Sequence, residues 1–186
     1  MDYVAECFSK FVKERFSTYR IGRHYYPEKP YSGSQHGQSA YLKTEADVQV
    51  KFGGYLESWL LEKHPGLIVH AELPIYSKAH QRADLTIHKV AAEDHWTTRQ
   101  QIIDSLESVI EVKLANARFP FFNLAKGCIS KDFSVLKEIP DHVKKYLLII
   151  DEREGVESDH AKEILDKASL YNINVISNNP VLHAIN

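Results

Sequence analysis

Two short stretches of this sequence carry residue types that could do chemistry together. RADL places Asp84 in one predicted strand, and IEVK places Glu111 and Lys113 in another. In an extended chain, residues two apart point to the same side, so Glu111 and Lys113 share one face. If the two strands are neighbours, Asp84 comes within reach of that face. Two carboxylates converging at a strand end suit a hard cation such as Mg²⁺ or Mn²⁺.

The lysine adds a second kind of group to these carboxylates. A divalent cation lowers the pKa of its water and neutralises charge on a phosphate, while a lysine can orient the nucleophile or add positive charge. Together these groups have the composition that phosphodiester hydrolysis requires. The simpler alternative is that Glu111 and Lys113 form an ion pair at the end of a core strand in some unrelated α/β fold.

Glu45 is a fourth candidate, because it lies three residues before Val48 and seven before Phe52. That spacing puts it on the predicted buried face of its helix. A carboxylate in the first turn also interacts favourably with the helix dipole. The residues alone therefore leave open whether Glu45 belongs to a site or only begins a helix.

The elements that must position these residues follow from periodicity. Helical patterns cover 3–17, 44–63, 122–139 and 158–171. Predicted strands cover 67–76, 82–90, 108–115, 144–151 and 172–178, with a five-residue hairpin link, SKAHQ, between the first two. Residues 18–43 read as a long loop, and 91–107 as a surface insertion with a short helical piece. The hairpin indicates antiparallel pairing early in the sheet, and the later alternation of helices and strands indicates parallel pairing. We therefore expect an α/β protein with a mixed β-sheet flanked by helices.

This order of elements and these motifs together resemble a known family. A helix with an acid, two strands of which the second carries Asp84, a strand with Glu-x-Lys, a helix and a strand (αβββαβ) are similar to the PD-(D/E)XK nuclease superfamily, which has the restriction-endonuclease-like fold. The proline that usually precedes the aspartate is Ala83 here. The resemblance covers about residues 44–151, and implies one nuclease-like domain over 1–186, with a helix and arm at 1–43 and the core at 44–178.

The resemblance also implies roles for individual residues. Asp84, Glu111 and the carbonyl of Val112 would be ligands of Mg²⁺ or Mn²⁺. Lys113 would position the attacking water, and Glu45 would complete the site through water. The implied activity is that of a metal-dependent endonuclease acting on DNA.

Seven other residues are candidates for nucleic-acid contact. Aromatic side chains stack on bases and cations hold phosphates. The predicted loop and the helix after the third strand supply both kinds: Arg20, Arg23, Tyr25, Tyr26, Lys29, Lys126 and Lys131. The alternative is a surface loop whose aromatic residues pack on the core, with solvated lysines on the helix.

Composition narrows the function further. The 186 residues carry 23 basic and 25 acidic side chains, for a net charge of −2, so any nucleic-acid contact must come from a local patch. No apolar run reaches the roughly 18 residues of a membrane span. Two cysteines form neither a disulfide framework nor a metal knuckle, so we expect a cytoplasmic protein. There is no glycine-rich phosphate loop, and hence no expected nucleotide cofactor.

Two functions therefore follow as expectations. The first is a nuclease in phage defence, restriction or repair, which cuts both strands as a homodimer or is directed by a partner protein. The alternative is a catalytically inactive module with the same fold that binds nucleic acid or assembles a complex.

Overall fold

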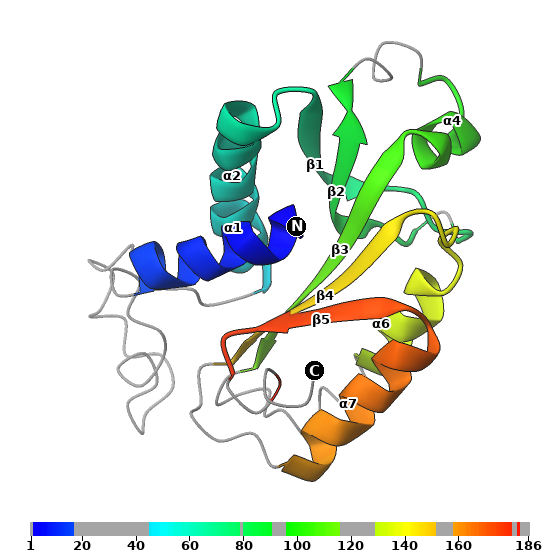
Figure 1. Ribbon diagram of the computed structural model, residues 1–186. Coiled ribbons are helices and arrows are strands. Elements are labelled where there is room, and N and C mark those ends of the chain that lie inside the picture. Colours follow the sequence, from blue (N-terminus) through cyan, green and yellow to red (C-terminus); the bar gives the residue numbers. More distant parts are fainter. Residues whose placement is uncertain are drawn as a thin grey trace, which may run out of the picture.

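A five-stranded mixed β-sheet forms the centre of the protein in a computed structural model (Figure 1). The structure describes residues 2–16, 45–78, 80–90, 96–115, 129–151, 158–179 and 182. The helices among them are α1 (Tyr3–Phe11), the π-helix η1 (Val12–Phe16), α2 (Glu45–Lys63), α4 (Arg99–Asp104), α6 (Ile129–Leu136) and α7 (Ser158–Leu170). The strands are β1 (Leu67–Leu73), β2 (Ala83–Lys89), β3 (Leu106–Ala115), β4 (Lys144–Asp151) and β5 (Ile173–Ser177).

The strands lie in the sheet in the order β1-β2-β3-β4-β5, so neighbours in sequence are neighbours in space. Pairing is antiparallel from β1 to β3 and parallel from β3 to β5. The change occurs where α6 lies between β3 and β4 along the chain, because parallel neighbours need a crossover connection. The predicted α/β class, with a mixed sheet flanked by helices, is confirmed.

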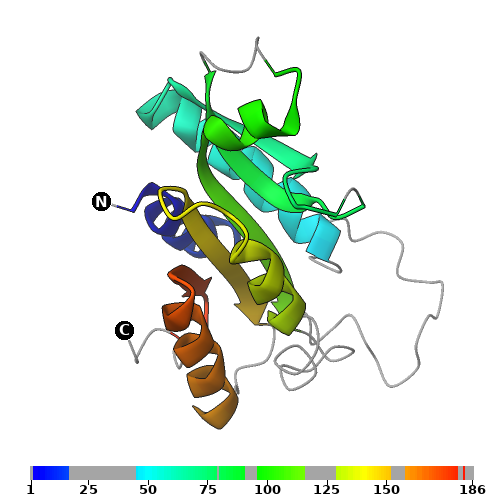
Figure 2. The same ribbon diagram turned by 90° about the vertical axis from the view of Figure 1, so that its right-hand side faces the viewer.

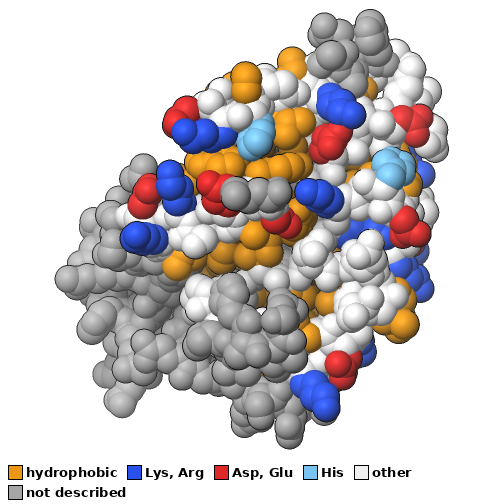
Figure 3. All heavy atoms as spheres, in the orientation of Figure 1, with side chains coloured by type: hydrophobic (Ala, Val, Ile, Leu, Met, Phe, Trp, Pro, Cys, Tyr) orange, Lys and Arg blue, Asp and Glu red, His pale blue; other side chains and the backbone are white. Residues whose placement is uncertain are grey.

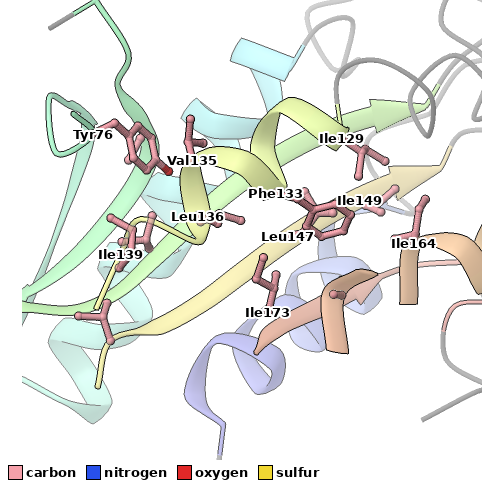
Figure 4. Packing of buried hydrophobic residues seen from close by; sticks show 14 of the residues in the cluster. Tyr76, Ile129, Phe133, Val135, Leu136, Ile139, Leu147, Ile149, Ile164 and Ile173 are labelled. Carbon is pink, nitrogen blue, oxygen red and sulfur yellow. The ribbon is translucent and has the colours of Figure 1, made fainter. Parts of the chain in front are cut away.

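Helices cover both faces of the sheet (Figures 1 and 2). Helices α1 and α2 lie on one face and α6 and α7 on the other. Each face has its own core: Phe11, Phe52 and Ile110 belong to the first, and Phe133 and Leu147 to the second (Figure 4). The apolar stripe predicted for α2 is buried as expected, apart from Tyr55, which is only partly buried. Burial of these stripes is the main force that holds the helices on the sheet.

The first hairpin differs from the prediction at its turn. Strand β1 ends at Leu73 instead of residue 76, and the link to β2 spans residues 74–82 instead of five residues. Glu72 has a φ of 59°, which departs from strand geometry. Beyond it, Ile75 and Tyr76 are buried in the core, at 0% and 2% exposure, instead of continuing the strand. These two apolar residues, which suggested a longer strand, pack in the core outside any strand.

The predicted helices differ mainly at their ends. The first helix changes to a π-helix at Val12. Helix α6 begins at Ile129 and ends at Leu136, so its predicted end at residue 139 is wrong, and residues 122–128 lie outside the described part. In the predicted insertion, α4 is the short helix, capped by Thr98 and Gln101, and β3 already begins at Leu106. Residue 44, the predicted start of α2, also lies outside the described part.

Candidate active site

Strands β2 and β3 bring Asp84 next to Glu111. Their antiparallel register pairs Thr86 with Val109 and Leu85 with Ile110, and the same register continued by one residue would bring Asp84 opposite Glu111. The backbone N–H of Val112 donates to Asp84 Oδ2 at 2.7 Å, which fixes the carboxylate against β3. Strands β2 and β3 are therefore neighbours, as the sequence-based hypothesis required, and the hydrogen bond to Val112 places the Asp84 carboxylate next to the Glu111 position on β3.

The second oxygen of Asp84 is held by a residue that the sequence did not single out. Gln49 of α2 donates from Nε2 to Asp84 Oδ1 at 2.5 Å. Burial raises the pKa of Asp84, as do the charges of Glu45 and Glu72, while the Val112 N–H and the Lys113 ammonium partly offset the rise. Two hydrogen bonds therefore hold the Asp84 carboxylate in place. The favourable contacts of its ionised form do not fully offset the cost of removing that charge from water.

Glu111 is more deeply buried, with 5% of its surface exposed. Its Oε1 accepts a hydrogen bond from the hydroxyl of Tyr76, a residue of the β1–β2 link that is absent from the sequence-based set. Burial raises the pKa of Glu111 well above the ordinary value, and the charge of Asp84 raises it further, although the Tyr76 hydrogen bond acts in the opposite direction. Two adjacent carboxylates in a site that excludes water disfavour full ionisation of both.

The Lys113 ammonium lies among three oxygen atoms. Nζ is 3.0 Å from the carbonyl oxygen of Val112, 3.2 Å from Asp132 Oδ2 and 3.4 Å from Glu45 Oε2. Burial by itself lowers the pKa of Lys113, but the surrounding carboxylates, led by Asp132, raise it to a net value above the ordinary one. Lys113 is therefore a charged ammonium.

Glu45 reaches this site from the first turn of α2. Its side chain is 42% exposed, so it lies at the edge of the site and not within it. Sequence alone left open a site role and a helix-start role, and the contact of Glu45 with the Lys113 ammonium is compatible with both. Its position in the first turn also remains favourable to the helix dipole.

Asp132 of α6 is a site residue that sequence reasoning missed. It is 7% exposed and belongs to the buried face of α6, together with Ile129, Phe133 and Leu136. Burial raises the pKa of Asp132 to about 6, against the opposing effect of the Lys113 ammonium. A signal was present in the sequence, since the spacing 129, 132, 133, 136 puts a carboxylate on an otherwise apolar helical stripe.

Glu72 of β1 is a further carboxylate near the site. It is exposed, and the β1–β2 register places it across from Asp84, between the pairs Ala71–Leu85 and Leu73–Ala83. Its charge contributes to the raised pKa of Asp84. Its exposure is that of a polar residue on an open part of a strand.

The electrostatic balance of the site is negative. Four carboxylates act on one ammonium, because Asp132, Glu45, Asp84 and Glu111 all raise the pKa of Lys113. Oxygen donors with excess negative charge have the chemistry that Mg²⁺ and Mn²⁺ prefer. Within the described residues, however, no three or more His, Cys, Asp or Glu side chains are grouped as a ready-made metal centre. The kind of donor, carboxylate oxygen, is the kind that a hard cation prefers, although the described side chains are not gathered into a complete ligand set.

The buried histidine His88 of β2 lies outside this cluster and is held by two hydrogen bonds. His88 Nδ1 is 2.9 Å from Ser105 Oγ, and its Nε2 is 2.9 Å from Thr86 Oγ1. Burial, with a smaller effect of His70, lowers the pKa of His88 to about 3. Both ring nitrogens of this neutral histidine already have hydrogen-bond partners.

Most of the predicted nucleic-acid contacts lie outside the described residues: Arg20, Arg23, Tyr25, Tyr26, Lys29 and Lys126. Lys131 is described, and it is exposed on α6 next to Asp132. On the face shown in Figure 3, acidic and basic side chains are interspersed, as expected for a net charge of −2.

Fold and site together define an α/β protein with a buried carboxylate–lysine cluster between the central sheet, α2 and α6. No family model, no curated protein and no solved structure matches the chain. Among the described helices, none combines the length and apolar character needed to cross a membrane.

Proposed function

We propose that this chain is a nuclease that hydrolyses phosphodiester bonds of DNA with Mg²⁺ or Mn²⁺. The observation that carries the proposal is the meeting of Asp84 with Glu111 across β2 and β3, with Lys113 two residues further along the same strand. A strand pair that only packed a core would not require a buried carboxylate, Glu111, beside the half-buried carboxylate of Asp84, because their repulsion is unfavourable.

The sheet supports the same proposal. A meander of three antiparallel strands followed by two parallel ones, with helices on both faces, is compatible with the restriction-endonuclease-like fold that the motifs implied. In that fold the Asp84 and Glu111 positions belong to adjacent strands, which is how β2 and β3 arrange them here.

The residues have complementary roles in the proposed reaction. Asp84, Glu111 and the Val112 carbonyl would hold the cation, which lowers the pKa of water and neutralises charge on the phosphate. Lys113 would donate a hydrogen bond that orients the attacking water, whose oxygen forms the new bond to phosphorus as the bond to the leaving oxygen breaks. The attacking water would give a proton to solvent, and the leaving oxygen would take a proton from solvent. The excess negative charge of the site repels a phosphate, so a cation is needed before the substrate can approach.

The test is cleavage of single- and double-stranded DNA by the purified protein, with Mg²⁺ or Mn²⁺ and with a chelator. Lys113→Ala should abolish cleavage, and a circular dichroism spectrum checks that the variant is folded, because the substitution removes the ion-pair partner of buried Asp132. The matched control is Lys145→Ala, because Lys145 is also a buried lysine with an aspartate partner, Asp141, but pairs with Val109 in the sheet, away from the site. Undiminished cleavage by Lys113→Ala would refute the assignment.

A second candidate is a nuclease-like module without catalysis that binds nucleic acid or assembles a complex. It is favoured by the way Asp132 and Glu45 already engage the Lys113 ammonium. Calorimetric titration with Mn²⁺ separates the two, with Glu111→Gln as the control. Binding that Glu111→Gln removes supports the nuclease, whereas absence of binding to the unaltered protein supports the module.

A further inference from the structure

We propose that Asp132 is a positioning residue that holds the Lys113 ammonium in its working place beside Asp84 and Glu111. This inference rests on the proposed nuclease function and extends it to α6, an element that carries none of the predicted motif residues. Its basis is the contact of Lys113 Nζ with Asp132 Oδ2 at 3.2 Å.

The two carboxylates that contact Lys113 differ in their access to water. The Glu45 side chain is 42% exposed, whereas that of Asp132 is 10% exposed. Water can replace an exposed partner and screens its charge, but it cannot replace a buried one. Of the two ion-pair partners of Lys113, Asp132 is therefore the one that restrains the position of the ammonium.

Asp132 in turn depends on Lys113. It lies on the buried face of α6, where the other buried residues are Ile129, Phe133, Val135 and Leu136. Its Oδ2 accepts no hydrogen bond from the described part of the chain. A buried carboxylate without a charged partner is strongly unfavourable, so the Lys113 ion pair is what allows an aspartate at this position.

The ion pair with Asp132 fixes where the Lys113 ammonium points. Lys113 is fixed to β3 by its backbone, but its long side chain has several rotatable bonds. The Val112 carbonyl, on the same strand, and Asp132, on α6, approach the ammonium from different elements. Removing the Asp132 charge leaves the ammonium free to adopt other rotamers, so it would no longer orient a water at a fixed point.

The first measurement is steady-state cleavage by the full chain. Asp132→Asn, which keeps the size of the side chain and removes its charge, should lower kcat by about 10- to 100-fold and change KM little, because misplacement of a catalytic group affects the chemical step. Asp132→Glu, which keeps the charge, should recover part of kcat. In a Lys113→Ala background, Asp132→Asn should cause no further loss. The control is Asp141→Asn, which removes the partner of the other buried lysine, Lys145, and should leave kcat unchanged.

A second measurement follows Lys113 without reference to cleavage. The Cε signal of Lys113 in a carbon–proton NMR spectrum, assigned by its loss in Lys113→Ala, should move in Asp132→Asn and stay in place in Asp141→Asn. If Asp132→Asn melts below the assay temperature, Asp132→Ala, which also removes the charge, takes its place in both measurements. An unchanged kcat and an unmoved Lys113 signal would overturn the inference and leave the nuclease proposal intact. A wild-type protein that cuts no DNA would overturn the nuclease proposal, and a moved signal would then show only a structural ion pair.

Discussion

Replacing Glu111 by glutamine should make the metal-free protein more stable, although it removes a proposed ligand. Glu111 is buried beside Asp84, and its raised pKa shows that its ionised form is disfavoured in the folded state. Glutamine has nearly the same shape, and its carbonyl oxygen can still accept the hydrogen bond from Tyr76. The substitution therefore removes the unfavourable charge and keeps the favourable contact.

The magnitude follows from the strand geometry. The Cβ atoms of residues that face each other on adjacent antiparallel strands lie about 4.5 to 5.5 Å apart. Two like charges about 5.5 Å apart would repel by about 3 kcal/mol at an effective dielectric constant of about 20. The wild-type protein relieves part of this by binding a proton, so we expect a gain of about 1 to 3 kcal/mol at pH 8. For a chain of this size, that gain corresponds to a rise in Tm of roughly 2 to 12 °C.

The assay is denaturant unfolding of the metal-free protein between pH 4 and pH 8. Because the folded pKa of Glu111 is raised, the wild type loses stability as the pH rises above the ordinary value of 4.5, and the advantage of Glu111→Gln should shrink toward that pH. Glu107→Gln is the control, since Glu107 lies on the same strand but forms a more exposed ion pair with Lys89. Equal or lower stability of Glu111→Gln at pH 8 would refute the electrostatic reasoning.

Asp84→Asn should behave differently from Glu111→Gln. The Asp84 carboxylate accepts from both Gln49 Nε2 and the Val112 N–H. The carboxamide of asparagine can accept only one of these bonds and turns its NH₂ group toward the other donor. We therefore expect no gain in stability, or a loss, in the same unfolding assay.

Three further predictions concern other parts of the chain and the proposed cation. Because the folded pKa of His88 is about 3 and its ordinary value is 6.5, His88 should lower the unfolding free energy by up to about 1.4 kcal/mol per pH unit as the pH falls through this window. Denaturation at several pH values should show a shallower slope for His88→Gln, and equal slopes would contradict the assignment. Gly54→Ala, where the added Cβ meets open space, should raise the stability of α2 by about 0.5 to 1 kcal/mol. Gly53→Ala places a Cβ 3.0 Å from a methyl group of Leu85, so its gain in stability should be smaller or should become a loss. Thermal melts of the two variants test this difference. Mn²⁺ binding should release protons and become tighter as the pH rises, because the raised pKa values of Asp84 and Glu111 keep protons on the metal-free site. Calorimetry in two buffers of different ionisation enthalpy measures the number of protons released. Zero proton release would argue against these ligands.

Local pattern made much of the architecture predictable. The strand at 144–151 has the predicted bounds, and the stripe of α2 packs on the sheet as its spacing indicated. These features depend on side chains a few residues apart, which a helical or extended backbone places on one side whatever the rest of the chain does. The same rule placed Glu111 and Lys113 on one face, and hydrophobic alternation placed Asp84 in a strand.

Other members of the site depend on contacts between distant elements. Tyr76 and Glu111 are 35 residues apart, as are Gln49 and Asp84. Neither contact could be predicted from the spacing of residues within one helix or strand. Asp132 reaches Lys113 only because α6 packs on the sheet at the one position along β3 that brings the two side chains together. The sequence by itself determined which residues could share a face, because that depends on backbone periodicity. Only the tertiary structure decided which carboxylates surround Lys113, because strand register and helix docking follow from the packing of the whole core.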